Sequence, residues 1–342
     1  KIFRNKELIS NTVISNYQNN YQEINDKINY CNSYEDWIEL YKILVYWELQ
    51  LEYIQEKEVS EILYSQKKQA NKLFADFIEA NYQKLIEKKD FLSSINLFRN
   101  KILPEINSAT PTLMILIDNL RYDQWKSIEP YVIENCTITT DILYSSILPT
   151  TTQYARNSIF SGLSPLELKN THYNYWVSEI DEGGKNKYED ELLRNQLLRI
   201  GKKIKHKYFK VSNSKEGNLF YDRLNNEKLN DLTVLVYNFV DMMSHAKKDV
   251  KFIKELTQTD QAYRELTKSW YKNSKLNDII KKGKDLGFKI IITSDHGTIN
   301  VDKPALISGD KEISNNLRYK TARQVHSKKK EVINLDNPSN FL

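Results

Sequence analysis

Three unbroken apolar segments in the second part of the chain restrict its possible folds most strongly. Residues 112–117, 233–240 and 288–293 are short and largely apolar, and segments with helical spacing of apolar residues separate them. Strands that are apolar on both faces are typical of parallel sheets covered by helices on both sides. The sequence therefore predicts an α/β fold with a mostly parallel sheet.

The segments between these strands indicate where the covering helices lie. Four helices are expected, over residues 124–134, 152–160, 189–200 and 252–286. Gly162 and Gly201 follow two of them and suit the left-handed conformation that often ends a helix. The β-branched segment 136–147 predicts a further strand followed by a loop.

The first part of the chain has a different character. Residues 1–107 contain no glycine, and their only proline is Pro104, while apolar residues recur at helical spacing. Ser33 can cap a helix because Asp36 stands three residues later. The apolar stripe of that helix comprises Trp37, Leu40, Tyr41, Leu44, Trp47, Leu51 and Ile54. This stripe predicts an all-α bundle.

The packing partners of this helix set the expected domain boundary. The partners are segments 8–21, 59–85 and 91–103. The turn-forming residues 108–111 then mark the change to strands. We therefore expect a helical bundle or linker domain over residues 1–107 and a second domain over residues 108–342.

Composition excludes several classes of protein and predicts a compartment. The chain has 50 Lys and Arg against 45 Asp and Glu, a formal charge of +5 that is too mild for a nucleic-acid coat. Mean hydropathy is −0.61, and no apolar run is long enough to span a membrane. Cys31 and Cys136 have no framework spacing, so we expect a reducing, cytoplasmic location and no membrane insertion.

The ends of the three apolar segments carry the most chemistry. The first ends at Asp118, the second at Asp241, and the third leads into Asp295 and His296. Because the carboxyl ends of parallel strands meet at one edge of a sheet, these side chains are expected to converge there. His245 lies four residues after Asp241, so both can face one ion from a helical turn.

The ligand types indicate the metal. A set of carboxylates and imidazoles without thiolates suits zinc, or alternatively manganese, better than calcium or magnesium. There are more ligands than one tetrahedral ion needs, which favours two ions about 4 Å apart. Such a pair of ions can bind the attacking and leaving oxygens of a phosphoryl transfer. His172, His206 and His326 lie in polar contexts and are expected at the surface.

A candidate nucleophile stands between the strand segments. Pro149 breaks the preceding strand, and Thr152 follows at the start of a predicted helix, where free backbone amides favour an anion. Arg156 comes one helical turn after Thr152, so its guanidinium can reach a phosphate bound there, although a surface salt bridge is an equal alternative.

Other phosphoryl-transfer classes fit less well. Leu120 stands where a haloacid-dehalogenase-type enzyme has its second Asp, and the chain has threonines where a sulfatase has Cys or Ser. The chain also has no glycine-rich loop of the P-loop type.

Taken together, these motifs resemble the alkaline phosphatase superfamily. They are Asp118, the Pro149-x-x-Thr152 element running to Gly162, Asp241 with His245, and the Ser-Asp295-His296-Gly sequence. The segments from Pro149 to Gly162 and from Asp118 to Arg121 resemble its PglZ branch. Nearly the whole chain resembles the helical linker plus PglZ domain of PorX-type response regulators, which control type IX secretion in Bacteroidetes.

This resemblance implies roles for the site residues. One zinc would be held by Asp118, Thr152, Asp295 and His296, and a second by Asp241 and His245. Thr152 would be the nucleophile, with Thr151 as the alternative if the turn is shifted. The implied activity is a phosphodiesterase acting on cyclic or linear oligonucleotides through a covalent phosphothreonine.

The resemblance also implies partners. These are an upstream receiver domain with its sensor kinase, components that regulate type IX secretion, and a second copy of the chain in a homodimer. The family takes a further ligand of the second zinc from a later His-Gly segment. This sequence has none, so we expect a C-terminally truncated domain unless His326 substitutes. The alternative hypothesis is a non-catalytic or weakly catalytic module that binds a nucleotide or protein.

Overall fold

The chain folds into two compact units, which the computed structural model describes over most of the sequence. The described residues are 2–54, 56–177, 183–238, 240, 259–301, 303–311, 313–314, 316–322, 324–326 and 332. The first unit is Lys1–Lys88 and the second is Lys89–Leu342. The boundary between the units therefore lies earlier in the sequence than the expected boundary at residues 107–108.

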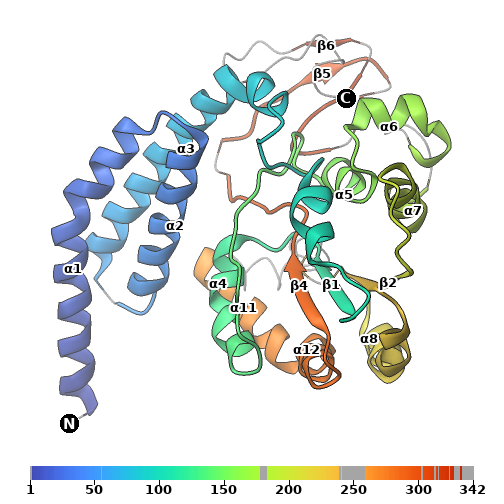
Figure 1. The fold of residues 1–342 in the computed structure, drawn as a ribbon. Coiled ribbons are helices and arrows are strands. Elements are labelled where there is room, and N and C mark those ends of the chain that lie inside the picture. The colour runs from blue at the N-terminus through green and yellow to red at the C-terminus, as the bar shows by residue number, and fades with distance from the viewer. Residues whose placement is uncertain are drawn as a thin grey trace. The chain divides into compact units, whose positions relative to one another are not determined.

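The first unit is a bundle of three helices, each of which contacts the other two (Figure 1). They are α1 (Ile2–Tyr30), α2 (Tyr34–Leu51) and α3 (Lys57–Ile86). Ser33 caps α2 and forms the predicted capping box with Asp36. The predicted stripe on α2 is buried at Trp37, Leu40, Leu44, Trp47 and Leu51, whereas Tyr41 is exposed. The helix ends at Leu51, so Ile54 lies beyond it. Apolar burial therefore holds the bundle together.

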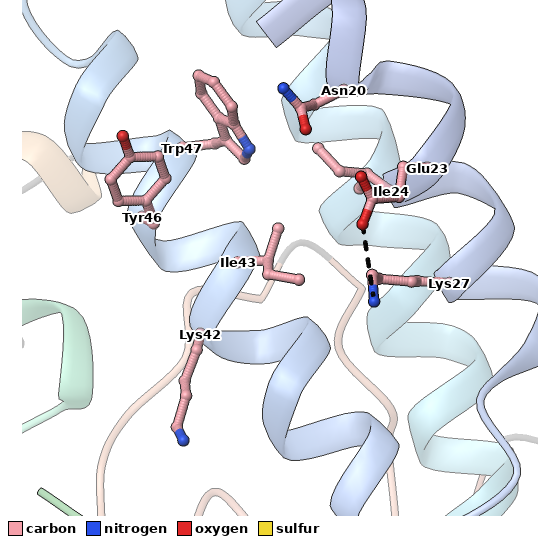
Figure 2. Close-up of a pocket in the computed structure, with 8 residues that line it drawn as sticks. All are labelled: Asn20, Glu23, Ile24, Lys27, Lys42, Ile43, Tyr46 and Trp47. Carbon is pink, nitrogen blue, oxygen red and sulfur yellow. Dashed lines mark ion pairs between the residues drawn. The ribbon is translucent and has the colours of Figure 1, made fainter. Parts of the chain in front are cut away.

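A cavity of about 370 Å³ lies between α1 and α2 (Figure 2). Ile24, Ile43 and Trp47 supply apolar walls, and Glu23 forms an ion pair with Lys27 at its rim, 3.8 Å between charged atoms. Among the described residues, the one cluster with metal-ligand spacing lies in the second unit instead. This cavity therefore does not carry the chemistry predicted above.

The second unit is built on a parallel sheet, as the apolar segments predicted. Four strands run in the order β2 (His206–Val211), β3 (Leu232–Tyr237), β1 (Thr112–Ile117) and β4 (Lys289–Thr293), all parallel. β1 and β3 are buried along their whole length. β1 lies between β3 and β4, so the ends of the three predicted strands are neighbours.

Helices cover both faces of this sheet (Figure 1). Side chains that alternate along β1 point to opposite faces, so Leu113, Ile115 and Ile117 join one core and Met114 and Leu116 the other. The first face is covered by α4 (Tyr122–Ile133), α8 (Ser214–Arg223), α11 (Asp260–Asn273) and α12 (Lys275–Asp285). The second is covered by α5 (Thr152–Ser161), α6 (Pro165–Thr171) and α7 (Glu189–Arg199).

Three expected elements differ from the structure. Residues 136–147 form no strand and pair only at Ser145 with Ser93; residues 139–142 are all exposed, so the segment has no buried face to pack on the sheet. Within 252–286, the described part is two helices, since Ser274 is extended between α11 and α12. Segment 91–103 packs in the second core, through Leu97, Phe98 and Ile102, and not in the bundle.

A short antiparallel pair, β5 (Ser308–Gly309) with β6 (Val325–His326), completes the described elements. None of the helices described here is both long and apolar enough to cross a membrane.

Candidate metal centre

The ends of β1 and β4 bring three predicted ligands together. Asp118 directly follows β1, and Asp295 and His296 follow β4, its neighbour in the sheet. One ligand atom from each of the three lies within 4.8 Å of the other two, and all three side chains are buried. This arrangement is the convergence at the carboxyl edge of a parallel sheet that the sequence predicted.

Thr152, which lies between Asp118 and Asp295 in the sequence, also contacts this cluster. It is the first residue of α5, and its Oγ1 lies 3.3 Å from Asp118 Oδ1 and 2.9 Å from His296 Nε2. Because it stands at the helix N-terminus, backbone N–H groups without helical partners surround it. Thr151 is the capping residue, and its own hydroxyl is buried without a hydrogen-bond partner.

The imidazole of His296 presents a lone pair to Thr152. Its Nδ1 lies 3.2 Å from the carbonyl oxygen of Gly297, which can only accept a hydrogen bond. A proton on Nδ1 satisfies this carbonyl oxygen and leaves Nε2 available as an acceptor or metal ligand. The single hydroxyl proton of Thr152 thus faces two acceptors, Nε2 and Asp118 Oδ1.

Asp295 has one carboxylate oxygen that accepts two hydrogen bonds and one that accepts none. Its Oδ1 accepts hydrogen bonds from the backbone N–H groups of Asn119 and His296, at 3.0 and 2.9 Å. Its Oδ2 is buried and has no hydrogen-bond partner. A buried carboxylate oxygen of this kind is costly unless a cation or donor compensates it. The residues present therefore fit a divalent metal ion.

Asp118 is also electrostatically strained. Burial, followed by the nearby charge of Asp295, raises the pKa of Asp118 to about 6 although Arg156 and His296 oppose the shift. Two buried carboxylates this close together favour a bound cation for the same reason that they raise each other's pKa.

The structure revises the role expected of Arg156. Its side chain is only 2% exposed, and its Nη1 donates to Asp118 Oδ2 at 2.6 Å while its Nε donates to Glu189. Burial alone would lower the pKa of Arg156, but Glu189 and Asp118 raise it well above its usual value. A guanidinium buried between carboxylates is not a surface salt bridge, and here it orients Asp118. The contact of Arg156 with a phosphate stays a prediction.

The remaining histidines and the second ligand pair lie elsewhere. Asp241 and His245 fall outside the described residues. His326 is exposed in β6, and His172 and His206 are half-buried, His206 beside Asp190. None of these three belongs to the Asp118 cluster described here.

Sequence reasoning missed several residues around the site. The sequence predicts Glu189 only as the first residue of a helix, and nothing in the sequence indicates its burial against Arg156. Tyr144 donates to the carbonyl oxygens of Ser294 and Asp295 and so holds the loop after β4. Arg318 donates to the carbonyl oxygens of Thr150 and Gly297, which joins the loops that carry Thr152 and His296.

A helix-covered parallel sheet with this ligand set at its carboxyl edge defines an alkaline-phosphatase-like domain. Residues 97–340 match the family model described as the BREX system PglZ alkaline phosphatase-like domain, and residues 7–86 match the PorX response regulator linker domain. The chain therefore belongs to the PglZ family, with its PglZ domain following a PorX-type response-regulator linker. The comparison with curated proteins finds no match.

Proposed function

We propose that this chain is a zinc-dependent phosphodiesterase in which Thr152 is the nucleophile. The observation that carries the proposal is the position of the Thr152 hydroxyl, 2.9 Å from His296 Nε2 and 3.3 Å from Asp118 Oδ1, beside the unpartnered oxygen of Asp295. Asp118, Thr152, Asp295 and His296 would hold the first zinc ion. Asp241 and His245 would hold a second.

The chain's own residues account for the nucleophilic step. Thr152 Oγ forms a bond to phosphorus, the bond from phosphorus to the leaving alcohol breaks, and a phosphothreonine results. The threonine proton leaves to solvent water and the leaving oxygen takes one up from water, because His296 Nε2 and Asp118 Oδ1 would be occupied as ligands of the ion. A water molecule then cleaves the phosphothreonine and restores Thr152. Zinc, when bound, would polarise the phosphoryl oxygens and lower the pKa of coordinated hydroxyl groups.

The helix that carries Thr152 also suits an anionic substrate. The unpaired N–H groups and positive dipole end of α5 lie at the nucleophile, where the phosphate would be placed. This supports a phosphoester substrate, and the PglZ family supports a hydrolase reaction. We propose oligonucleotide phosphodiesters, linear or cyclic, as the substrate class.

The linker match supports a place in signalling. We propose that the PglZ domain is the output of a response regulator controlled by an upstream receiver and its sensor kinase, acting in the regulation of type IX secretion as a homodimer in the cytoplasm. In that arrangement the helical unit would transmit the signal from the receiver.

One observation favours a second candidate function, a nucleotide- or protein-binding module with little turnover. Arg156 already donates to Asp118 and lies 3.8 Å from Asp295 Oδ2, so part of the buried negative charge is compensated without a metal. A site that is partly neutralised in this way can bind ligands without performing hydrolysis.

Turnover of a generic phosphodiester and of a dinucleotide by the zinc-loaded chain tests the proposal. Thr152→Ala should lower kcat by at least about 1,000-fold while leaving the circular dichroism spectrum unchanged. Thr151→Ala is the matched control and should retain activity. Loss in Thr151→Ala alone would move the nucleophile by one residue, and binding without turnover in the wild type would favour the second candidate.

Zinc titration after chelator treatment tests the metal part separately. We expect two tight equivalents, one of which is lost in Asp241→Ala. A chain that binds no zinc would remove the hydrolase proposal.

A further inference from the structure

A buried carboxylate next to the metal centre has no part in the proposed reaction. Glu189 stands at the first position of α7 and is 1% exposed. It accepts hydrogen bonds from Arg156 Nε and from the Tyr208 hydroxyl, and Lys210 Nζ lies 3.8 Å from it. Burying such a group is costly unless it is hydrogen-bonded, and here two hydrogen bonds and a nearby ammonium group compensate it.

The geometry of Arg156 connects this carboxylate to the metal centre. A guanidinium is a rigid plane, so fixing its Nε fixes the direction of its Nη1 as well. Glu189 holds Nε, and Nη1 donates to Asp118 Oδ2 at 2.6 Å. The orientation of Asp118 is therefore set by Glu189 through one intervening side chain.

This orientation divides the two oxygens of Asp118 between different tasks. Oδ2 is taken by Arg156, whereas Oδ1 faces Thr152 Oγ1 at 3.3 Å and His296 Nε2 at 3.7 Å. A carboxylate held in this way offers one oxygen to a cation in a fixed direction. Groups that fix a ligand from behind commonly change metal affinity by 10- to 100-fold when removed.

Glu189 also controls where the positive charge of Arg156 lies. Arg156 Nη1 is 3.8 Å from Asp295 Oδ2, the oxygen without a hydrogen-bond partner. Among the carboxylates of the described part of the chain that pair with Arg156, Asp118 and Asp295 would remain without Glu189. Arg156 would then compete with a cation for the same carboxylates.

We propose that Glu189 is a positioning residue that sets the cation affinity of the Asp118 site by holding Arg156 away from Asp295. The inference rests on the metal site of the proposed function and adds a residue to which no role had been given. Tyr208 supports Glu189 by donating its hydroxyl to it.

Zinc titration of the chelator-treated full chain tests this inference. The quantity measured is the affinity of the zinc equivalent that Asp118→Asn removes. Glu189→Gln keeps the size of the side chain but removes its charge, and should weaken that affinity by about 10-fold or more. Glu191→Gln, two residues later on α7, is the matched control and should leave it unchanged.

A second variant covers the case in which Glu189→Gln does not fold. Tyr208→Phe removes only the hydroxyl group, keeps every charge, and should weaken the same zinc affinity by a few-fold. A double variant isolates the route through Arg156. When Arg156→Met is already present, adding Glu189→Gln should change the zinc affinity by less than about 2-fold, because the competing guanidinium is gone.

The outcomes separate this inference from the proposed function. Unchanged zinc affinity in folded Glu189→Gln, or in Tyr208→Phe if the former is unfolded, overturns the positioning role. An equal loss with and without Arg156 also overturns it, since the effect would then not pass through that residue. Weakened zinc binding in a chain without phosphodiesterase turnover would support the positioning role and contradict the proposed reaction.

Discussion

At the scale of single residues, the site contains two buried carboxylates with unequal surroundings. Asp118 has Arg156 on one oxygen, whereas Asp295 uses one oxygen for backbone N–H groups and leaves the other unpartnered. The cost of this unpartnered oxygen is borne by the metal-free protein. Binding sites of this kind commonly exchange stability of the free protein for affinity.

Asp295→Asn should therefore act in opposite directions on stability and on metal binding. The amide keeps the oxygen that accepts from Asn119 and His296 but removes the negative charge. In the presence of chelator, we expect the free energy of unfolding in urea to rise by on the order of 1 kcal/mol. Tight zinc binding should be lost. A fall in the stability of the chelator-treated protein would contradict the assignment of Asp295 as a strained ligand.

At the scale of elements, the sequence predicted best where one physical signal dominated. The central strands β1 and β3 are buried along their whole length, and β4 is a partly exposed edge strand. Each of the three was expected from its apolar segment. The partly exposed edge strand β2 was missed, because its His, Lys and Tyr side chains interrupt any apolar run. The break at Ser274 was also missed, because the helical spacing of apolar residues was taken to continue through it, although Ser274 is the N-cap of α12 and serine favours that position.

The end of α5 offers a test at this scale. Gly162 has φ +63°, as predicted for a C-cap, and a Cβ there would lie 2.9 Å from the Gln196 side chain. Gln196 in turn donates to the carbonyl oxygens of Ile159 and Phe160. Gly162→Ala should cost about 2–3 kcal/mol in the free energy of unfolding, through left-handed strain plus displacement of Gln196.

Gly201→Ala is the matched control for this variant. Gly201 also has a positive φ, +73°, but no atom lies within 4 Å of its would-be Cβ. It should cost only about 1 kcal/mol. Equal losses in urea unfolding would show that Gln196 does not matter at this position.

At the scale of the whole molecule, interactions between distant parts of the sequence complete the structure. Arg121 and Arg264 both donate to Asp123, and Arg121 also donates to Asp260, so the loop after β1 is joined to α11. Similarly, Arg156 joins Asp118 to Glu189. Sequence reasoning found Asp118, Thr152, Asp295 and His296 because strand and helix ends mark them. It could not find Glu189 or the Arg264 pair, because nothing local indicates which distant charge a buried residue meets.

The Asp123 network predicts a pH dependence. Burial would raise the pKa of Asp123, but Arg121 and Arg264 hold it below its usual value. The unfolded chain therefore binds this proton more readily, so the contribution of Asp123 to stability is present above about pH 4 and is lost as the pH falls through the folded-state pKa.

Asp123→Asn should lower the free energy of unfolding by about 3 kcal/mol at pH 7, since it removes the buried negative charge to which Arg121 and Arg264 both donate. The difference from wild type should shrink below about pH 4. Asp285→Asn, at an exposed carboxylate beside Lys284, should change stability by less than about 0.5 kcal/mol. Urea unfolding across this pH range measures both. A difference that stays constant with pH would contradict the assignment.

The position of β1 in the sheet has a consequence for how the protein matures during synthesis. β1 is synthesised before β3 and β4 but lies between them in the sheet. Asp118, at the end of β1, clusters with Asp295 and His296, which are synthesised much later. A ribosome-bound chain that lacks residues 289–296 has neither the neighbouring strand nor two of the three clustered ligands. The three clustered side chains can therefore come together only after β4 has left the ribosome, so an unfinished chain that lacks β4 carries Asp118 without its two partners.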